Sequence, residues 1–73
     1  MITSDMDRWQ AIRPTKVFFE DPNQEALRIP AGGIVVTKDY SPLSQRTWFF
    51  IEVFPGMFWL DTEQFTQNFE RAL

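Results

Sequence analysis

The sequence of 73 residues contains no cysteine and no histidine. Without cysteine there is neither a disulfide nor a thiol nucleophile, and without both residue types the usual ligands of zinc, copper and haem iron are missing. Catalytic Ser-His-Asp and Cys-His arrangements are excluded as well. Only carboxylates are left for acid–base catalysis, and turns and helix capping account for most of them. We therefore expect a protein that is not an enzyme and that carries no metal and no cofactor.

Charge and hydrophobic patterning argue against two further classes. Seven basic residues stand against ten acidic ones, for a net charge of −3, and the basic residues form no run. Nucleic-acid backbones are bound by clustered cations, so nucleic acid is not the expected partner, although Arg46 near Trp48 pairs a cation with an aromatic ring locally. No apolar run approaches the roughly 18–20 residues of a membrane span. The N-terminus is unlike a secretory signal, so we expect a cytoplasmic protein without membrane contact.

Residues 1–14 are predicted to form an N-terminal tail or one short helix, ahead of a single small domain over residues 15–73. Ser4 suits the N-cap of such a helix, and Pro14 would end it. Trp9 favours docking of this segment, because a large aromatic side chain gains nothing on a free tail.

The segment before residue 45 alternates between strand and turn signals. Four consecutive β-branched residues predict a strand over 34–38, and two further extended segments are expected over 16–20 and 26–30. In the turn that precedes the strand over 34–38, Gly32 or Gly33 is expected to take a positive φ or to let another strand approach closely.

Residues 46–60 are the most informative part of the chain, because six of these fifteen residues are aromatic. The segment predicts a β-hairpin with Pro55-Gly56 at the centre of a type II turn. Both faces of the first strand are mostly apolar, which is typical of a strand that is covered on both sides or that binds a partner. Since side chains alternate between faces, one face carries Trp48, Phe50, Glu52 and Phe54.

The C-terminal segment over 61–73 changes to a helical period. Phe65, Phe69 and Leu73 form an apolar stripe at four-residue spacing. Asp61 as N-cap and Gln64 three residues later match a capping box. We expect a helix whose stripe covers one face or opening of the sheet.

Strands that are near neighbours in sequence indicate an antiparallel meander. The predicted fold class is all-β, or α+β, with a small barrel or a strongly bent sheet of 4–5 strands and a C-terminal α-helix. The turn into a strand over 29–36 and the Phe54-Pro55-Gly56-Met57 hairpin resemble parts of an SH3-like small barrel, over about residues 15–61. The resemblance implies the shape alone, because the acidic-aromatic peptide groove of signalling SH3 domains is absent. The alternative is an open antiparallel sheet with the helix on one face.

The surplus of aromatic residues points to protein binding, because Trp, Tyr and Phe are enriched at the centres of interfaces. Our hypothesis is a non-enzymatic protein–protein interaction module: a small adaptor, subunit or regulator. For any one aromatic residue a place in the core is an equal explanation, and Glu52 is also explained as a charge that guards a strand from edge pairing. The candidate partner-binding residues are Trp48, Phe50, Glu52, Phe54, Trp59 and Tyr40.

Two alternatives use the same surface. In the first alternative, the protein is a small inhibitor of phage or mobile-element type that blocks a host protein. In the second, it is a homodimer that buries the aromatic patch against itself through an isologous contact. The sequence does not distinguish between these alternatives and the adaptor hypothesis.

Overall fold

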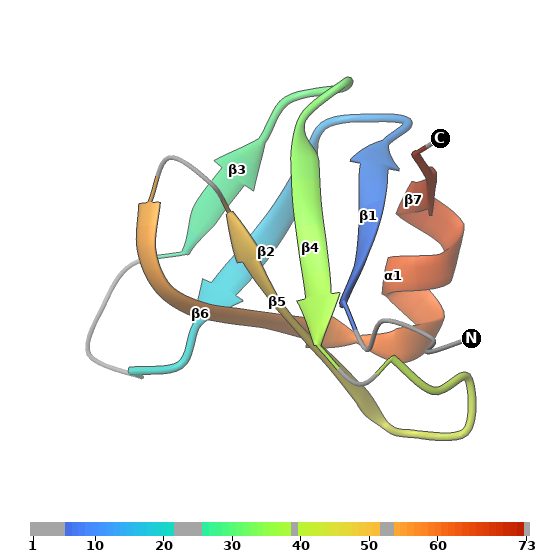
Figure 1. Cartoon of the computed structure of the whole chain (residues 1–73). Helices are drawn as coiled ribbons and strands as arrows, with labels where there is room; N and C mark the ends of the chain where they lie inside the picture. Colours follow the sequence, from blue (N-terminus) through green and yellow to red (C-terminus); the bar gives the residue numbers. More distant parts are fainter. Residues whose placement is uncertain (1–5, 22–25, 39, 52–53, 73) are drawn as a thin grey trace.

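The structure is a computed structural model that describes residues 6–21, 26–38, 40–51 and 54–72. Within these ranges, seven strands form one antiparallel sheet and one short helix, α1, follows the sixth strand (Figure 1). The elements are β1 (Met6–Ala11), β2 (Thr15–Phe19), β3 (Leu27–Ile29), β4 (Ile34–Lys38), β5 (Arg46–Ile51), β6 (Phe54–Asp61), α1 (Thr62–Asn68) and β7 (Phe69–Arg71). Their order across the sheet is β3-β2-β6-β5-β4-β1-β7.

The β-rich fold with a helix near the C-terminus confirms the predicted class, but the sheet is larger than predicted. It has seven strands in the described residues instead of four or five, and it is open, with β3 and β7 at its two ends. The strands predicted over 16–20, 26–30 and 34–38 correspond to β2, β3 and β4. The additional strands are β1, from the segment predicted as a tail or one short helix, and β7, from the segment predicted as part of the C-terminal helix.

The helix expected near the N-terminus is wrong for Met6–Ala11, which form β1. This strand lies between β4 and β7 and pairs with both, so its backbone donors and acceptors are satisfied across the sheet instead of along a helix. Trp9 and Ala11 point to the inner face and are buried. The burial of Trp9 confirms the predicted docking of this segment, and long-range pairing overrides its weak local preference for helix.

The hairpin of β5 and β6 is confirmed, but Pro55-Gly56 does not lie at its turn. Cα register places Ile51 opposite Phe54 and Phe49 opposite Phe58, with a shift between the two pairs. Because β6 has more residues than β5 between these pairs, the Pro-Gly pair lies within a bulge of β6. Its glycine has a φ of +104°, so the positive φ expected in a turn occurs in a bulge.

The C-terminal helix is shorter than predicted and ends at Asn68. The next three residues turn back as β7 and pair with β1. Phe65 is buried from the helix and Phe69 from the strand, while Leu73 lies outside the described residues. Asp61 precedes the helix but makes no side-chain hydrogen bond to it, so the capping box predicted from the sequence does not form.

The turn between β3 and β4 is confirmed, and its two glycines have different roles. Gly32 has a φ of +88°. At Gly33 a Cβ atom would lie 2.5 Å from Cγ2 of Ile29 and 3.0 Å from the carbonyl oxygen of Pro30. The first glycine therefore permits the left-handed backbone of the turn, and the second permits the close return of the chain into β4.

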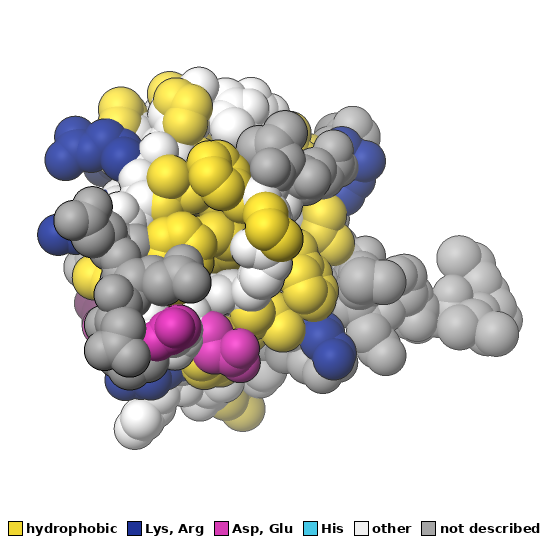
Figure 2. Space-filling view, turned by 90° about the vertical axis from the view of Figure 1, so that its left-hand side faces the viewer, with side chains coloured by type: hydrophobic (Ala, Val, Ile, Leu, Met, Phe, Trp, Pro, Cys, Tyr) yellow, Lys and Arg dark blue, Asp and Glu magenta, His cyan; other side chains and the backbone are white. Residues whose placement is uncertain are grey.

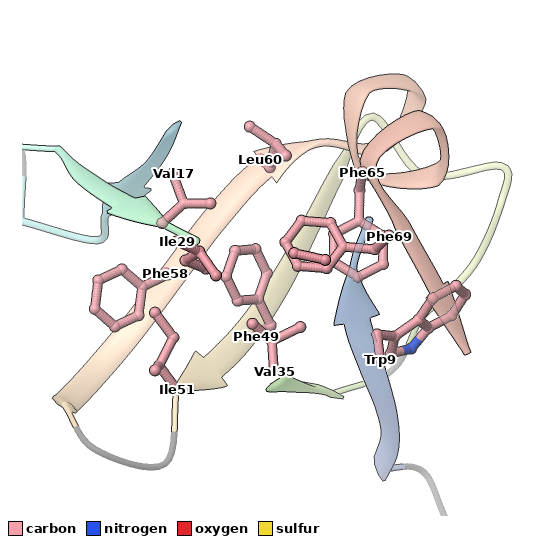
Figure 3. Packing of buried hydrophobic residues seen from close by; sticks show 11 residues of the cluster. Trp9, Val17, Ile29, Val35, Phe49, Ile51, Phe58, Leu60, Phe65 and Phe69 are labelled. Carbon is pink, nitrogen blue, oxygen red and sulfur yellow. The ribbon is translucent and has the colours of Figure 1, made fainter. Parts of the chain in front are cut away.

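The hydrophobic core fills the inner face of the sheet and is rich in aromatic rings (Figure 3). The rings of Phe65 and Phe69 stack at a centroid distance of 4.6 Å, and Phe49 lies 5.6 Å from Phe65. Such ring pairs contribute about 0.5–1.5 kcal/mol each beyond their area of burial, which compensates in part for the small size of the chain. The buried cluster comprises Trp9, Ala11, Val17, Ile29, Val35, Phe49, Ile51, Phe58, Leu60, Phe65 and Phe69.

Candidate functional site

The alternation of side chains along β5 divides the hairpin into an inner and an outer face. Thr47, Phe49 and Ile51 are buried, whereas Trp48 and Phe50 point the other way and are half-buried. The helix α1 contributes its Phe65 to the inner core. Among the described residues, no helix covers the outer face, so these two aromatic side chains remain in contact with solvent.

Three aromatic side chains form a row across the outer face of β5, β6 and β2. Cα register places Trp48 opposite Trp59, and Trp59 opposite Phe18. The centroids of the first pair are 6.4 Å apart, and the second pair stacks at 4.9 Å with an interplanar angle of 27°. Phe18 is 37% exposed. The row thus continues the apolar outer face of the hairpin onto β2.

Positive charges border this row. The guanidinium of Arg46 lies over the ring of Trp59, 4.0 Å from its centroid, and the ammonium of Lys16 lies 5.9 Å from the centroid of Phe18. Both distances are within the range of cation–π contacts. We name these residues, together with Lys38 and the row itself, the aromatic–cationic surface: Lys16, Phe18, Lys38, Arg46, Trp48 and Trp59.

An open hollow of about 420 Å³ lies within this surface, lined by Lys38, Ser44, Arg46, Trp48 and Met57. Its lining carries two cations, and none of the described lining residues is acidic. Asp61 is the register partner of Arg46, but no salt bridge joins the two within the described parts of the chain. The guanidinium instead remains over Trp59. The hollow therefore places two cations beside the ring of Trp48, with Asp61 on the strand next to Arg46.

The predicted site residues do not all lie together. Trp48 and Trp59 belong to the aromatic–cationic surface, and Phe50 lies on the same outer face opposite Val36 of β4. Tyr40 is placed elsewhere: its ring packs against Trp9 at a centroid distance of 5.0 Å, and it is partly buried against the core.

Phe54 lies at the start of β6 and is 44% exposed. Its register partner is the buried Ile51, so it points away from the outer face that carries Trp48. The sequence predicted that these two aromatic side chains share one face of a single strand, but β5 ends at Ile51 and Phe54 belongs to β6, so the alternation along β5 does not extend to Phe54. Glu52, the sixth predicted site residue, lies outside the described residues.

Phe54 instead lines a pocket with a volume of about 270 Å³. The pocket lies between β3, the start of β4 and the end of β5. Figure 2 views the side of the molecule on which β3 and the start of β6 lie, and shows hydrophobic side chains gathered there. The lining is mostly apolar, and its named side chains include Leu27, Arg28, Ile29, Ile34, Ile51 and Phe54.

Four members of the aromatic–cationic surface were not among the predicted site residues: Lys16, Phe18, Lys38 and Arg46. Lys16 and Phe18 reach it because β2 pairs with β6, some forty residues away in sequence. Lys38 reaches it because β4 pairs with β5. The spacing of Lys16 and Phe18 on one face of a strand was visible in the sequence, but the pairing that brings them beside Trp59 was not.

Comparisons with protein-family models, curated proteins and solved structures gave no significant match. Within the described residues, no helix has the length and apolar character to cross a membrane. The function of this chain must accordingly be inferred from its surface.

Proposed function

We propose that this protein is a non-enzymatic protein–protein interaction module, a small adaptor, subunit or regulator, that binds its partner through the aromatic–cationic surface. The observation that carries the proposal is the row of Phe18, Trp59 and Trp48 on a sheet face with no covering element among the described residues. Large aromatic side chains next to arginine are the composition typical of interface centres. We retain the SH3-like shape as an expectation from the sequence, but the proposed binding surface does not depend on it.

Burial of the row would supply the driving force for association. Each square ångström of apolar surface removed from water contributes about 25 cal/mol, and rings contribute this area with few rotatable bonds to immobilise. The cations at the border would orient the partner, because complementary charge fixes register and accelerates encounter more than it adds affinity. This division of roles favours a protein partner with an apolar centre and polar rim.

The test is affinity capture from the lysate of the native host with the tagged wild-type chain and two variants. Trp48→Ser removes the β5 end of the row, whereas Ile12→Ser changes an exposed apolar residue of the connection between β1 and β2. A partner captured by wild type and Ile12→Ser but lost from Trp48→Ser would support the proposal. Partners retained equally by a folded Trp48→Ser chain would overturn it.

Self-association through the same surface has a separate readout. Sedimentation equilibrium of the wild-type chain at about 100 µM is expected to give the mass of a monomer. A homodimer with a Kd of 1 µM or below would be more than about 90% formed at that concentration and would therefore be detected. A dimer that dissociates in Trp48→Ser would instead assign the surface to a second copy of the chain.

A further inference from the structure

We infer that the hollow beside Trp48 binds a side-chain carboxylate from an acidic segment of the partner, with Arg46 and Lys38 as the anion-binding residues. This inference rests on the proposed function and specifies the chemistry of the partner. The protein as a whole has a net charge of −3, yet both charged residues of this hollow are basic. The charge of this lining is therefore opposite to the net charge of the molecule, and it favours an acidic segment of the partner.

Arg46 is held in a conformation suited to this role. Its guanidinium carbon lies 4.0 Å from the ring centroid of Trp59, and a guanidinium held against an aromatic face keeps the N–H groups that do not point at the ring available for a carboxylate. Bidentate arginine–carboxylate pairs are stronger than neutral hydrogen bonds. Because the ring already restricts the side chain, less conformational entropy remains to be lost on binding.

Lys38 lies on the neighbouring strand with its side chain on the same face. Val36 pairs with Phe50. Because the strands are antiparallel and side chains alternate, Lys38, two residues after Val36, lies on the same face as Trp48, two residues before Phe50. The polar residue of the hollow is already engaged, since the single hydroxyl proton of Ser44 has two carbonyl acceptors in range, those of Ser41 and Arg46 at 2.8 and 3.1 Å from its oxygen. The two cations are thus the groups of the lining that are suited to bind an anion.

The geometry favours an acidic peptide segment over single-stranded nucleic acid. A nucleic-acid site requires ring faces on which bases stack, but Trp59 is already in contact with Phe18 at 4.9 Å and with the Arg46 guanidinium at 4.0 Å. A phosphodiester chain also requires a continuous track of cations. Here two cations line one hollow, and Lys16 lies across the aromatic row beside Phe18. An occupant with local carboxylates and apolar side chains matches this pattern.

The test uses the full chain labelled with ¹⁵N and follows its three indole N–H signals by NMR. The probes are a short synthetic peptide of Asp, Glu and Phe, the same peptide with Lys in place of every acidic residue, and polyuridylate as single-stranded RNA. The acidic peptide is expected to shift the indole signals of Trp48 and Trp59 in a saturable, salt-sensitive manner. The indole of Trp9, which is buried and bonded to Thr37, serves as an internal control and should not move.

Variants with the same change in net charge distinguish the contribution of charges at the hollow from the effect of net charge on binding of the acidic peptide. Arg46→Gln is expected to weaken binding of the acidic peptide about tenfold, the effect of losing one charge-assisted contact; Lys38→Gln acts in the same direction. Arg13→Gln makes the same change in net charge at an exposed position between β1 and β2, and its effect is expected to be less than about twofold.

Four results would overturn the inference. The first is no shift of the Trp48 and Trp59 signals with the acidic peptide at about 1 mM, where a site with a Kd of about 1 mM is half-occupied, and the second is equal binding of the lysine peptide. The third is an equal loss of peptide affinity in Arg13→Gln and Arg46→Gln, and the fourth is Arg46-dependent binding of polyuridylate in place of the peptide. If the captured partner depends on Trp48 but is retained by Arg46→Gln, the proposed function stands and the acidic chemistry of the partner is wrong.

Discussion

The indole Nε1–H of Trp9 donates a hydrogen bond of 3.0 Å to the hydroxyl oxygen of Thr37, 28 residues further along the chain. The same hydroxyl donates to the backbone carbonyl of Asp7 at 3.3 Å. Side-chain hydrogen bonds thus tie β1 to β4 in addition to the ladder between them. Because both side chains are buried, the indole N–H depends on the Thr37 hydroxyl oxygen as its acceptor.

Thr37→Val is expected to destabilise the fold by about 1–3 kcal/mol, because it preserves shape but leaves the indole N–H buried without an acceptor. Urea unfolding monitored by circular dichroism measures the change. Combined with Trp9→Phe, the loss is expected to be smaller than the sum of the single losses by at least about 0.5 kcal/mol, since the two residues share one interaction. Strict additivity would show that the hydrogen bond does not contribute.

Phe65→Ala is expected to cost about 3–5 kcal/mol, because the ring is fully buried and its removal leaves a cavity. It is the residue through which α1 packs against the rings of Phe49 and Phe69. Leu43→Ala is the control: its side chain is 94% exposed, and a change within about 0.5 kcal/mol is expected. Equal effects in thermal unfolding would contradict the described core.

Asp61→Ala is expected to cost less than about 0.5 kcal/mol, well below the roughly 1 kcal/mol of a working N-cap. The physical reason is that Asp61 makes no side-chain hydrogen bond at the start of α1 and only the weak, exposed interaction with the helix dipole is lost. Chemical denaturation distinguishes the two magnitudes. A loss above about 1 kcal/mol would mean that the capping box read from the sequence does form.

Gly33→Ala is expected to destabilise the protein by about 1–3 kcal/mol, the usual cost of forcing a group into occupied space. The added methyl would lie 2.5 Å from Cγ2 of Ile29, a buried side chain that cannot simply move aside. Ala31→Ser, at an exposed position of the same turn, should be nearly neutral. Comparable midpoints in guanidinium unfolding for the two variants would refute the close approach.

The strands that were predicted from the sequence are those with strong local signals. Ile34–Lys38 has β-branched residues throughout its core, and it forms β4 with the predicted bounds. Met6–Ala11 has no comparable signal and becomes a strand because β4 and β7 lie on either side of it. Phe69–Arg71 likewise follows the helical period of the preceding residues, and its pairing with β1 ends the helix early.

The candidate site was predicted in part for the same reason. Strict alternation along β5 correctly placed Trp48 and Phe50 on one side and Phe49 on the other. The bulge in β6 interrupts that alternation, and nothing local to Pro55-Gly56 distinguishes a bulge from a turn. The contribution of β2 follows from a pairing between distant segments, which no single-sequence pattern determines.

The pairing of β1 with β7 means that this side of the sheet is completed only after the last described strand has been synthesised. β1 is the first strand of the described residues to be synthesised and β7 is the last, so one side of β1 has no partner until Phe69–Arg71 have left the ribosome. Joining such distant segments requires closure of a long loop, which slows folding. During synthesis, the side of β1 that pairs with β7 therefore stays without its partner strand until the end of the described chain has emerged, although β4 can pair with the other side of β1 earlier.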